Sequence, residues 1–471
     1  MSTNGSEAQR QLREAWDAML ASLAEARDAL DQPALMPPPL SERNLAEGYR
    51  YLMGHLHAAV ERAFHTDPLR PQFRNALSPV TRATIDNADA IYFYAPLDGR
   101  RSYLLRGDVA DARPWREEPR PWRGAAPAAS GRKAPHYVIF ETSFGVLAGD
   151  SGELSELRPG VKTQTGRLDS SELALNPDGS FEILLAPERP AGFAGNYLST
   201  LKRVSQPHPL DPSIGSERYA QYVSGRQLFY DWEREEAIHF EIAPLEDAGE
   251  ASDYGAEQAA RELRRFGEIV RGQMKFWNAF WTIPMGTYGP RPGTIPGIGF
   301  PRNAFNTINA ASGATGGGMS TNLYAGGVAR LAEDEALIVE NRIQLAPQYI
   351  GFQVANPWGE SIEYANRVGS RNGFQSHVDD DGATRLVLAH RDPGVQNWVD
   401  LTGHAEAFMS PRWAYSKTPP TEQWPTITAK RVPLTEVRKH LPDNTPPYSA
   451  AARRAEIALR QRHVRKRFRA F

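Results

Sequence analysis

The sequence predicts a mainly β protein with two related antiparallel β units in tandem, an α-helical N-terminal extension, and helices that connect and follow the units. Three observations predict this class. Short runs of aromatic and β-branched residues alternate with turn dipeptides over most of the chain. The 39 glycines and 37 prolines among 471 residues exceed the average combined share of about 12%. Two distant segments also share one pattern of turn, strand and loop.

Residues 1–77 are expected to form a helical extension. Apolar residues recur there at steps of three and four, the period of one helix face. They are Leu12, Trp16, Leu20 (or Met19), Leu23 and Leu30, then Leu45, Tyr49, Leu52, Leu56, Val60 and Phe64. Ser41 is the expected N-cap of the second helix. His55 and His57 are two residues apart, so on a helix they point away from each other and cannot share a metal ion.

The strand-rich regions predict two β domains, residues 78–250 and residues 331–442. Within the first, residues 111–134 are too rich in Pro, Arg and small residues for a strand, so a surface insertion is expected. Between the two domains, residues 251–330 are expected to form a helix followed by a glycine-rich loop. This loop, residues 286–327, contains eleven glycines and is either a lid or binding loop or a packed arm.

The chain ends in a basic segment, residues 443–471. Its last part, residues 451–471, contains eight Arg or Lys residues and one Glu. Such a segment can bind an anionic membrane surface, RNA or an acidic neighbouring subunit. Its apolar side is limited to Ile457, Leu459, Val464 and Phe468. We therefore expect a solvated tail, or an arm that contacts another copy in a homo-oligomer.

An internal repeat supports the tandem arrangement. Asp178–Leu201 aligns with Asp381–Gly403, each with an Asp-Gly turn, a strand, a proline-containing loop and then Asn followed by an aromatic residue. The matching pairs are Asn196-Tyr197 and Asn397-Trp398, and each is followed by a strand with an arginine, Arg226 or Arg412. We expect each Asn to bond the backbone of its turn and the aromatic residue to fill the core. Pro411 predicts an edge or a bulge in the last of these strands.

The second unit also resembles a known bacterial family. The segment DPGVQNWVDLTGH, Asp392 to His404, is the most specific part of a likeness that runs from Asp334 to Pro442. In these residues the chain closely resembles the family of domain of unknown function 1214, and the first unit more loosely resembles the N-terminal half of related bipartite proteins. The resemblance implies a β-rich, jelly-roll-like architecture, so we expect two tandem antiparallel β-sandwich units. It implies no catalytic residues.

Composition and missing motifs exclude several classes of function. The 54 Lys and Arg residues nearly balance the 56 Asp and Glu residues, so bulk charge gives no support for nucleic-acid binding. The chain has no cysteine, no GK[ST] phosphate loop, no HExxH and no GxSxG, and GATGGGMS lacks the context of a nucleotide site. It has neither an apolar run of signal-peptide type nor a membrane-spanning window. We therefore expect a cytoplasmic protein without an integral membrane segment, a metal or another cofactor.

Alternation predicts a polar and aromatic strand face in the second unit. If residues 357–372 start as a regular strand, one face carries Trp358, Glu360, Ile362, Tyr364 and Asn366, and the same period aligns His404, Glu406, Phe408, Ser410 and Arg412. A His–Glu pair can act as a general base, a tyrosine as an acid, and an arginine can hold a carboxylate or an oxyanion. The expected catalytic residues are Glu360, Tyr364, His404 and Arg412, and the expected substrate-binding residues are Trp358, Asn366, Glu406, Phe408, Phe305 and Tyr324. The alternative is that these strands simply present their solvent face.

Two hypotheses of function follow, with a third from the basic segment. The first is a cytoplasmic catabolic enzyme, a cofactor- and metal-independent lyase or hydrolase that acts on a hydrophobic or aromatic small molecule. The second is a non-catalytic protein of binding or assembly, for carbohydrate or another small molecule, in which an exposed Trp358 holds the ligand. The third is a peripheral-membrane or scaffold protein that uses residues 451–471.

Overall fold

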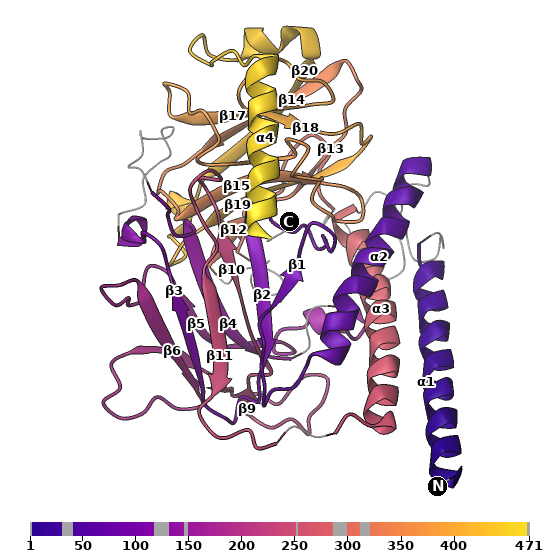
Figure 1. The fold of residues 1–471 in the computed structure, drawn as a ribbon. Helices are drawn as coiled ribbons and strands as arrows, with labels where there is room; N and C mark the ends of the chain where they lie inside the picture. Colours follow the sequence, from indigo (N-terminus) through magenta and orange to yellow (C-terminus); the bar gives the residue numbers. More distant parts are fainter. Residues whose placement is uncertain are drawn as a thin grey trace.

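The computed structural model describes residues 2–30, 41–116, 131–145, 149–250, 253–285, 299–310 and 321–468. Two β units lie one above the other, with three helices along one side (Figure 1). The helices are α1 (Ser2–Asp28), α2 (Glu42–Phe64), α3 (Ala256–Met285) and α4 (Ala450–Arg467), and 3-10 turns span Arg113–Arg116, Leu154–Leu157, Thr421–Gln423 and Leu434–His440. The mainly β class and the helical N-terminal extension are thus confirmed. The predicted insertion 111–134 and the loop 286–327 lie partly outside the described residues.

The first unit is a sandwich of two sheets. Their strand orders are β1-β2-β10-β4-β5 and β11-β3-β6-β7, and β8 pairs with β9 in a separate ribbon. The strands are β1 (Arg74–Leu77), β2 (Ala90–Pro96), β3 (Tyr103–Asp108), β4 (Tyr137–Phe144), β5 (Thr163–Asp169), β6 (Ser180–Ala186), β7 (Asn196–Ser199), β8 (Leu201–Arg203), β9 (Glu217–Tyr219), β10 (Tyr222–Leu228) and β11 (His239–Pro244). Phe140, Phe181, Ile183 and Leu185 are among the side chains buried between its sheets.

The second unit is also a two-sheet sandwich. Its strand orders are β12-β19-β15-β16, with β13 also paired to β19, and β18-β17-β14-β20. The strands are β12 (Asn322–Tyr324), β13 (Gly327–Ala329), β14 (Glu335–Arg342), β15 (Tyr349–Ala355), β16 (Ser370–Asn372), β17 (Ala383–Ala389), β18 (Trp398–Asp400), β19 (Ala407–Ala414) and β20 (Thr426–Pro433). Its core includes Leu337, Val354, Leu386 and Met409.

The two units share one topology, which confirms the tandem β-sandwich architecture. Across the first sheet of each unit, the strand order β2-β10-β4-β5 corresponds to β12-β19-β15-β16. Across the second sheet, β11-β3-β6-β7 corresponds to β20-β14-β17-β18. All pairs in these sheets are antiparallel except β6 with β7 and β17 with β18, which are parallel at the same place in each unit. The sequence repeat therefore corresponds to a repeated structural unit.

The repeated asparagines have the structural role expected from the sequence. The side-chain Nδ2 of Asn196 donates to the carbonyls of Ala174 and Glu182, and its Oδ1 accepts from the N–H of Ala174. Asn397 makes the same three bonds, with His377 and Arg385. The next residues also agree, because Tyr197 donates to the carbonyl of Ala186, and Trp398 donates to that of Ala389, each at the end of the neighbouring strand.

Pro411 lies in a central strand, so the expected edge position is wrong. The strand β19 runs between β15 and the pair β12 and β13. On that second side, β13 pairs with Ala407 to Met409 and β12 pairs with Arg412 to Ala414. Pro411, which has no N–H to donate, sits where the partner strand is broken, so the sheet accommodates it without a bulge.

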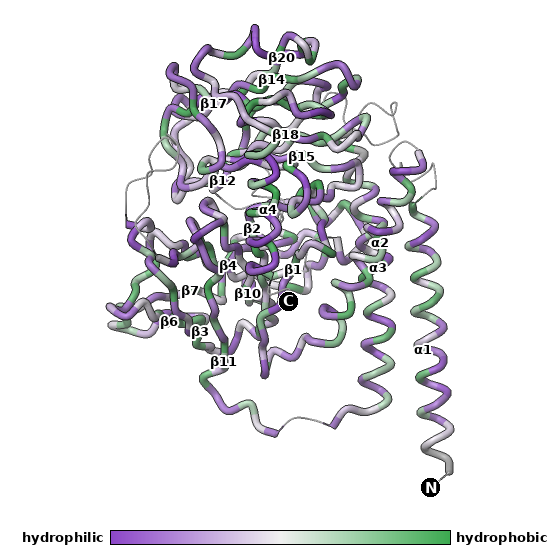
Figure 2. The backbone as a smooth tube through the Cα atoms, turned by 45° about the horizontal axis from the view of Figure 1, so that its top comes forward, coloured by the Kyte–Doolittle hydropathy of each residue, from purple (hydrophilic) through white to green (hydrophobic). Residues whose placement is uncertain are grey.

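The helices α1, α2 and α3 pack together beside the β units, and Figure 2 shows hydrophobic and hydrophilic residues alternating along α1. Ser41 caps α2 as predicted, since its side chain accepts from the N–H of Asn44. The buried face of α1 is not the predicted one, because Trp16 and Leu20 are 51% and 46% exposed whereas Met19 is buried. The reason is a close approach at Gly267 of α3, where a Cβ would lie 3.0 Å from Met19 and from Ser22.

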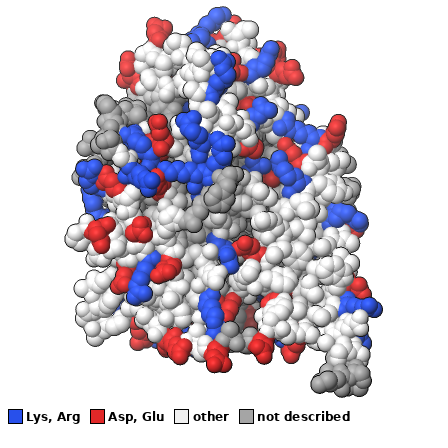
Figure 3. Space-filling view, viewed as in Figure 1, with Lys and Arg blue, Asp and Glu red and all other residues white. Residues whose placement is uncertain are grey.

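The basic C-terminal segment is not a solvated tail in the described residues. Its helix α4 packs against both units across their junction (Figure 1), and Arg453, Arg460, His463 and Arg467 are buried on its inner face. Arg467 donates to the carbonyl of Ala88 in the first unit. The outward basic residues are Arg454, Arg462, Arg465 and Lys466. Figure 3 shows Lys and Arg side chains gathered on this face of the molecule.

Candidate functional site

The predicted strand face around Glu360 does not form. Strand β15 ends at Ala355, and residues 356–366 are mainly turns. The Oδ1 of Asn356 accepts from the N–H groups of Trp358 and Glu360, which closes the first turn. Alternation therefore does not apply, and the expected face of Trp358 to Asn366 is wrong. The physical reason is the local Asn turn, which competes with the strand.

Glu360 and His404 face helix α2 and form part of one polar network. Nε2 of His404 lies 3.0 Å from both carboxylate oxygens of Glu47. Arg50 forms an ion pair with Glu360 at 2.7 Å, and the side chain of Asn356 donates to both Glu47 and Glu360. These side chains join α2 to the second unit, so the structure uses them as a contact between elements.

The other expected residues near Glu360 are also packed against helices. Trp358 is 1% exposed, donates from Nε1 to the carbonyl of Asn44 and stacks on Tyr51, with 5.9 Å between ring centroids. The hypothesis of an exposed Trp358 is therefore wrong, because α2 covers the indole. Tyr364 is buried beneath the guanidinium of Arg467, 5.3 Å from its ring. The Oδ1 of Asn366 accepts from Gln461 of α4.

Three more predicted residues lie away from that network. Glu406 forms an ion pair with Arg302 at 3.3 Å, and it precedes β19 and is not part of the strand. Phe305 packs against the core of the second unit, with its ring 6.4 Å from that of Phe352. Phe408 is buried on β19, and its ring lies 5.0 Å from that of Trp281.

Arg412 and Tyr324 lie together on a cavity of about 200 Å³ between the two units. The outer faces of the β2-β10-β4 and β12-β19-β15 sheets pack on each other beside it. The helix α3 supplies an aromatic wall, and described parts of the glycine-rich loop supply another. The lining residues include Tyr92, Arg226, Phe276, Trp277, Phe280, Trp281, Phe300, Asn306, Asn322, Tyr324, Ser410 and Arg412.

The two arginines of this cavity occupy equivalent positions in the two units. On β10, Arg226 is opposite Tyr92 of β2 and Ile139 of β4. On β19, Arg412 is opposite Tyr324 of β12 and Gly351 of β15, which is the match of Ile139. The cavity thus receives an arginine and a tyrosine from the same strand positions of each sandwich. The sequence predicts Arg412 as a site residue and Arg226 only as its match in the repeat, and that match was the available signal for Arg226.

Two further sets of lining residues were missed from the sequence. Tyr92 lies on a strand that carries no motif, and only its pairing with Arg226 places it in the cavity. The aromatic residues of α3 lie within residues 251–330, where the sequence predicts a helix before the glycine-rich loop but no binding residue on that helix. Of these, Trp277 and Trp281 are nearly buried, and both still contribute to the wall.

The chemistry of the wall is cationic, amide-rich and aromatic. Among the described residues that line it there is no Asp or Glu. Nη2 of Arg412 donates to the carbonyl of Ile85 at 3.1 Å and lies 3.0 Å from Oγ of Ser410. The guanidinium of Arg226 lies over the ring of Tyr92 at 5.3 Å. Burial raises the pKa of Tyr92, so its phenol stays protonated near neutral pH.

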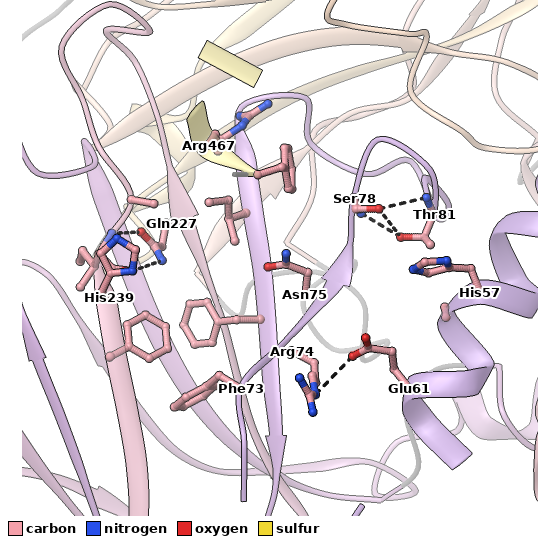
Figure 4. A pocket seen from close by; sticks show the side chains of 17 residues that line it. His57, Glu61, Phe73, Arg74, Asn75, Ser78, Thr81, Gln227, His239 and Arg467 are labelled. Carbon is pink, nitrogen blue, oxygen red and sulfur yellow. Dashed lines mark hydrogen bonds and ion pairs between the residues drawn. The ribbon is translucent and has the colours of Figure 1, made fainter. Parts of the chain in front are cut away.

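A second hollow of about 430 Å³ opens beside α2, β1 and β11 (Figure 4). Its floor is aromatic and includes Phe73 and Phe93. The polar groups on its walls bond one another: Arg74 forms an ion pair with Glu61 at 3.4 Å, and Gln227 bonds the backbone of its neighbour Ile238. None of the site residues predicted from the sequence lines this hollow, whereas Arg412 and Tyr324 line the cavity between the units, so the cavity is the stronger candidate.

Two kinds of feature are absent from the described residues. No group of three or more His, Asp or Glu side chains in the described ranges is placed to hold a metal ion. Within the same ranges, no helix combines the length and apolar character that crossing a bilayer requires.

Comparison with one solved structure shows a shared fold. Neither a protein-family model nor a curated protein matches the chain. The crystal structure of an uncharacterized protein from Burkholderia cenocepacia matches with a TM-score of 0.69 and 22% identity, over 91% of this chain and 99% of that one. The VPA0106 protein from Vibrio parahaemolyticus matches with a TM-score of 0.40 and 11% identity, over 87% and 100%. The first likeness extends over nearly the whole chain, including both units.

Proposed function

We propose that the protein binds a compact hydrophobic or aromatic small molecule in the cavity between its two β units. The observation that carries this proposal is the aromatic wall of Phe276, Trp277, Phe280 and Trp281 around about 200 Å³ of space. An apolar cavity of roughly 150 Å³ is large enough for benzene, so one ring with a small substituent matches this volume. Ligand sites also occur preferentially between domains.

A second candidate function is catalysis at the same site. Tyr92 and Tyr324 are phenols in the wall, and their oxygens accept from the backbone N–H of Asn87 at 2.8 Å and from the side chain of Asn322 at 2.9 Å. A protonated phenol can act as a general acid. A lyase or hydrolase that needs neither a metal nor another cofactor, as expected from the sequence, is consistent with such proton transfer. Glu360, Tyr364 and His404 lie outside the lining residues, so this candidate relies on the two lining tyrosines.

A cavity-filling variant tests the binding proposal. Ala325 is a buried lining residue, and Ala325→Leu adds bulk to the wall. We expect calorimetry with benzyl alcohol, phenylacetamide and phenylacetate to show binding to the native protein and at least tenfold weaker binding to this variant. The matched control is Ala451→Leu on the exposed side of α4, which leaves affinity unchanged. Equal affinity of the native protein and A325L, or no binding of any ring compound, contradicts the proposal.

Catalysis is tested on the ligand that binds. Mass spectrometry of the incubated compound shows a new product if the protein is an enzyme. Tyr324→Phe then abolishes turnover while binding is retained. Binding without chemical change in the native protein favours the non-catalytic alternative. The proposal also includes four expectations from the sequence. They are membership of the second unit in the family of unknown function 1214, a catabolic role, a cytoplasmic location and a homo-oligomeric state. Native mass spectrometry tests the oligomeric state.

A further inference from the structure

The charge of the cavity wall is unbalanced among the described lining residues. Two guanidinium groups, Arg226 and Arg412, line the space, and no carboxylate does. Arg412 is only 7% exposed. A charge that has lost most of its hydration is unfavourable unless an opposite charge or good hydrogen bonds compensate for it. The wall therefore favours a ligand that brings negative charge.

Arg412 retains a donor that the protein does not use. Its Nη2 donates to Ile85 and contacts Ser410, but its Nε is buried and has no hydrogen-bond partner among the described residues. The carboxylate of Asp86 lies outside the lining and partly compensates the charge of Arg412. Its two oxygens accept from the N–H and the hydroxyl of Ser361 at 2.8 Å and 2.7 Å, and Nε of Arg412 stays without a hydrogen bond in the described part of the chain. A guanidinium with an unused N–H in a cavity is suited to a carboxylate.

The cavity is lined by two chemically different groups of side chains. Arg226 and Arg412 lie on central strands of the two sheets, and each is paired with a tyrosine of the neighbouring strand, Tyr92 or Tyr324. The second group is aromatic and comes from α3, including Phe280 and Trp281. An amphipathic molecule matches both groups, with its charged group at the strands and its apolar body at the helix. The volume of about 200 Å³ limits that body to about one ring.

We propose that the ligand is a small organic anion, a monocyclic aromatic carboxylate, whose carboxylate is held by Arg412 and Arg226 while its ring packs against α3. This inference rests on the proposed function, because it specifies the ligand of the same cavity. The equivalent origin of the two arginines means that each β unit supplies one cationic group to one ligand. Neither unit alone provides both.

The test compares anionic and neutral ligands of one shape. Calorimetry is run with phenylacetate and phenylacetamide on the native protein and on Arg412→Gln, Arg226→Gln and Arg412→Lys. We expect the native protein to bind phenylacetate at least tenfold more tightly than the amide. R412Q and R226Q are each expected to remove the preference for phenylacetate and to keep the affinity for phenylacetamide within about twofold of the native value. R412K is expected to retain part of the preference for phenylacetate. The matched control, Arg330→Gln, lies on an exposed side chain outside the cavity and changes neither affinity.

The outcomes separate the two proposals. Equal binding of amide and acid, or full acid affinity in R412Q and R226Q, overturns the inference and leaves the cavity as a site for neutral rings. No binding of either compound to the native protein overturns both proposals. If R412Q fails to fold, as judged by its circular dichroism and unfolding midpoint, R226Q carries the comparison, since Arg226 supplies the equivalent group from the other unit.

Discussion

His136 and Gln348 occupy the same position in the two β units and contact each other. Nε2 of His136 lies 2.6 Å from the carbonyl oxygen of Gln348, and the two residues directly precede Tyr137 of β4 and Tyr349 of β15. Contact between equivalent residues is the mark of an isologous interface, in which one surface patch packs on its own counterpart. The two units of this single chain therefore pack as the subunits of a symmetric dimer do.

This contact predicts a pH dependence of stability. Burial lowers the pKa of His136 to about 4, despite its hydrogen bond to Gln348. The unfolded chain takes up this proton near pH 6.5 and the folded protein only near pH 4, so stability falls as the pH drops from about 6.5 to 4. Between pH 7 and pH 5 the protein therefore loses about 2 kcal/mol of stability through this residue, and His136→Gln is expected to abolish that part of the loss. Urea unfolding of the native protein and the variant at pH 7 and pH 5 measures the loss of stability. Identical losses in the two proteins contradict the prediction.

The ion pair between Glu47 and His404 predicts that α2 depends on the second unit. Burial tends to raise the pKa of Glu47, but the hydrogen bond and charge of His404, together with Arg43, lower it to about 2. The resulting stability is present above about pH 4.5 and is lost as the pH falls through 2. Glu47→Gln is expected to destabilise the protein by about 2 kcal/mol at pH 7. In a double-mutant cycle with His404→Ala, additive effects would show that the pair is not coupled.

An Arg→Gln substitution is expected to reduce stability strongly on the buried face of α4 and very little on its exposed face. Arg460 is 1% exposed, donates to the carbonyl of Ser370 at 2.5 Å and lies 4.9 Å over the ring of Trp232. Arg460→Gln is expected to lower the free energy of unfolding by about 3 kcal/mol, because its partners stay buried. The matched change Arg462→Gln, on the exposed face, stays within about 0.5 kcal/mol. Equal effects in thermal unfolding would contradict the burial of this face.

The sequence predicts the fold well because its signals are local or repeated. Strand alternation and turn residues act over a few positions, and the repeat around Asn196 and Asn397 specifies the same hydrogen bonds twice. The Ser41 cap is likewise settled within one helical turn. Each of these features depends on neighbours that are close in the sequence, so pattern analysis finds them.

The candidate site is predicted only in part, because it depends on contacts between distant elements. Arg412 and Tyr324 are among the expected residues, and they do line the cavity. Glu360 and His404 instead bond residues of α2, which lies more than 300 residues earlier in the sequence, and no local pattern indicates this contact. The turn at Asn356 also removes the regular strand on which the expected face depended. The missed aromatic wall comes from α3, which lies outside both sandwiches.

A helix near each end of the chain contacts the β unit that lies farther away in the sequence, and this affects how the protein can be made. The helix near the start binds the second unit through Glu47 and His404, 357 residues apart, and the helix at the end reaches back to Ala88 through Arg467, 379 residues apart. During synthesis the contact of α2 with His404 forms only after most of the second unit has been made, and α4 follows both units in the chain. Native packing of the first unit is therefore completed only after the second unit and α4 have been synthesised.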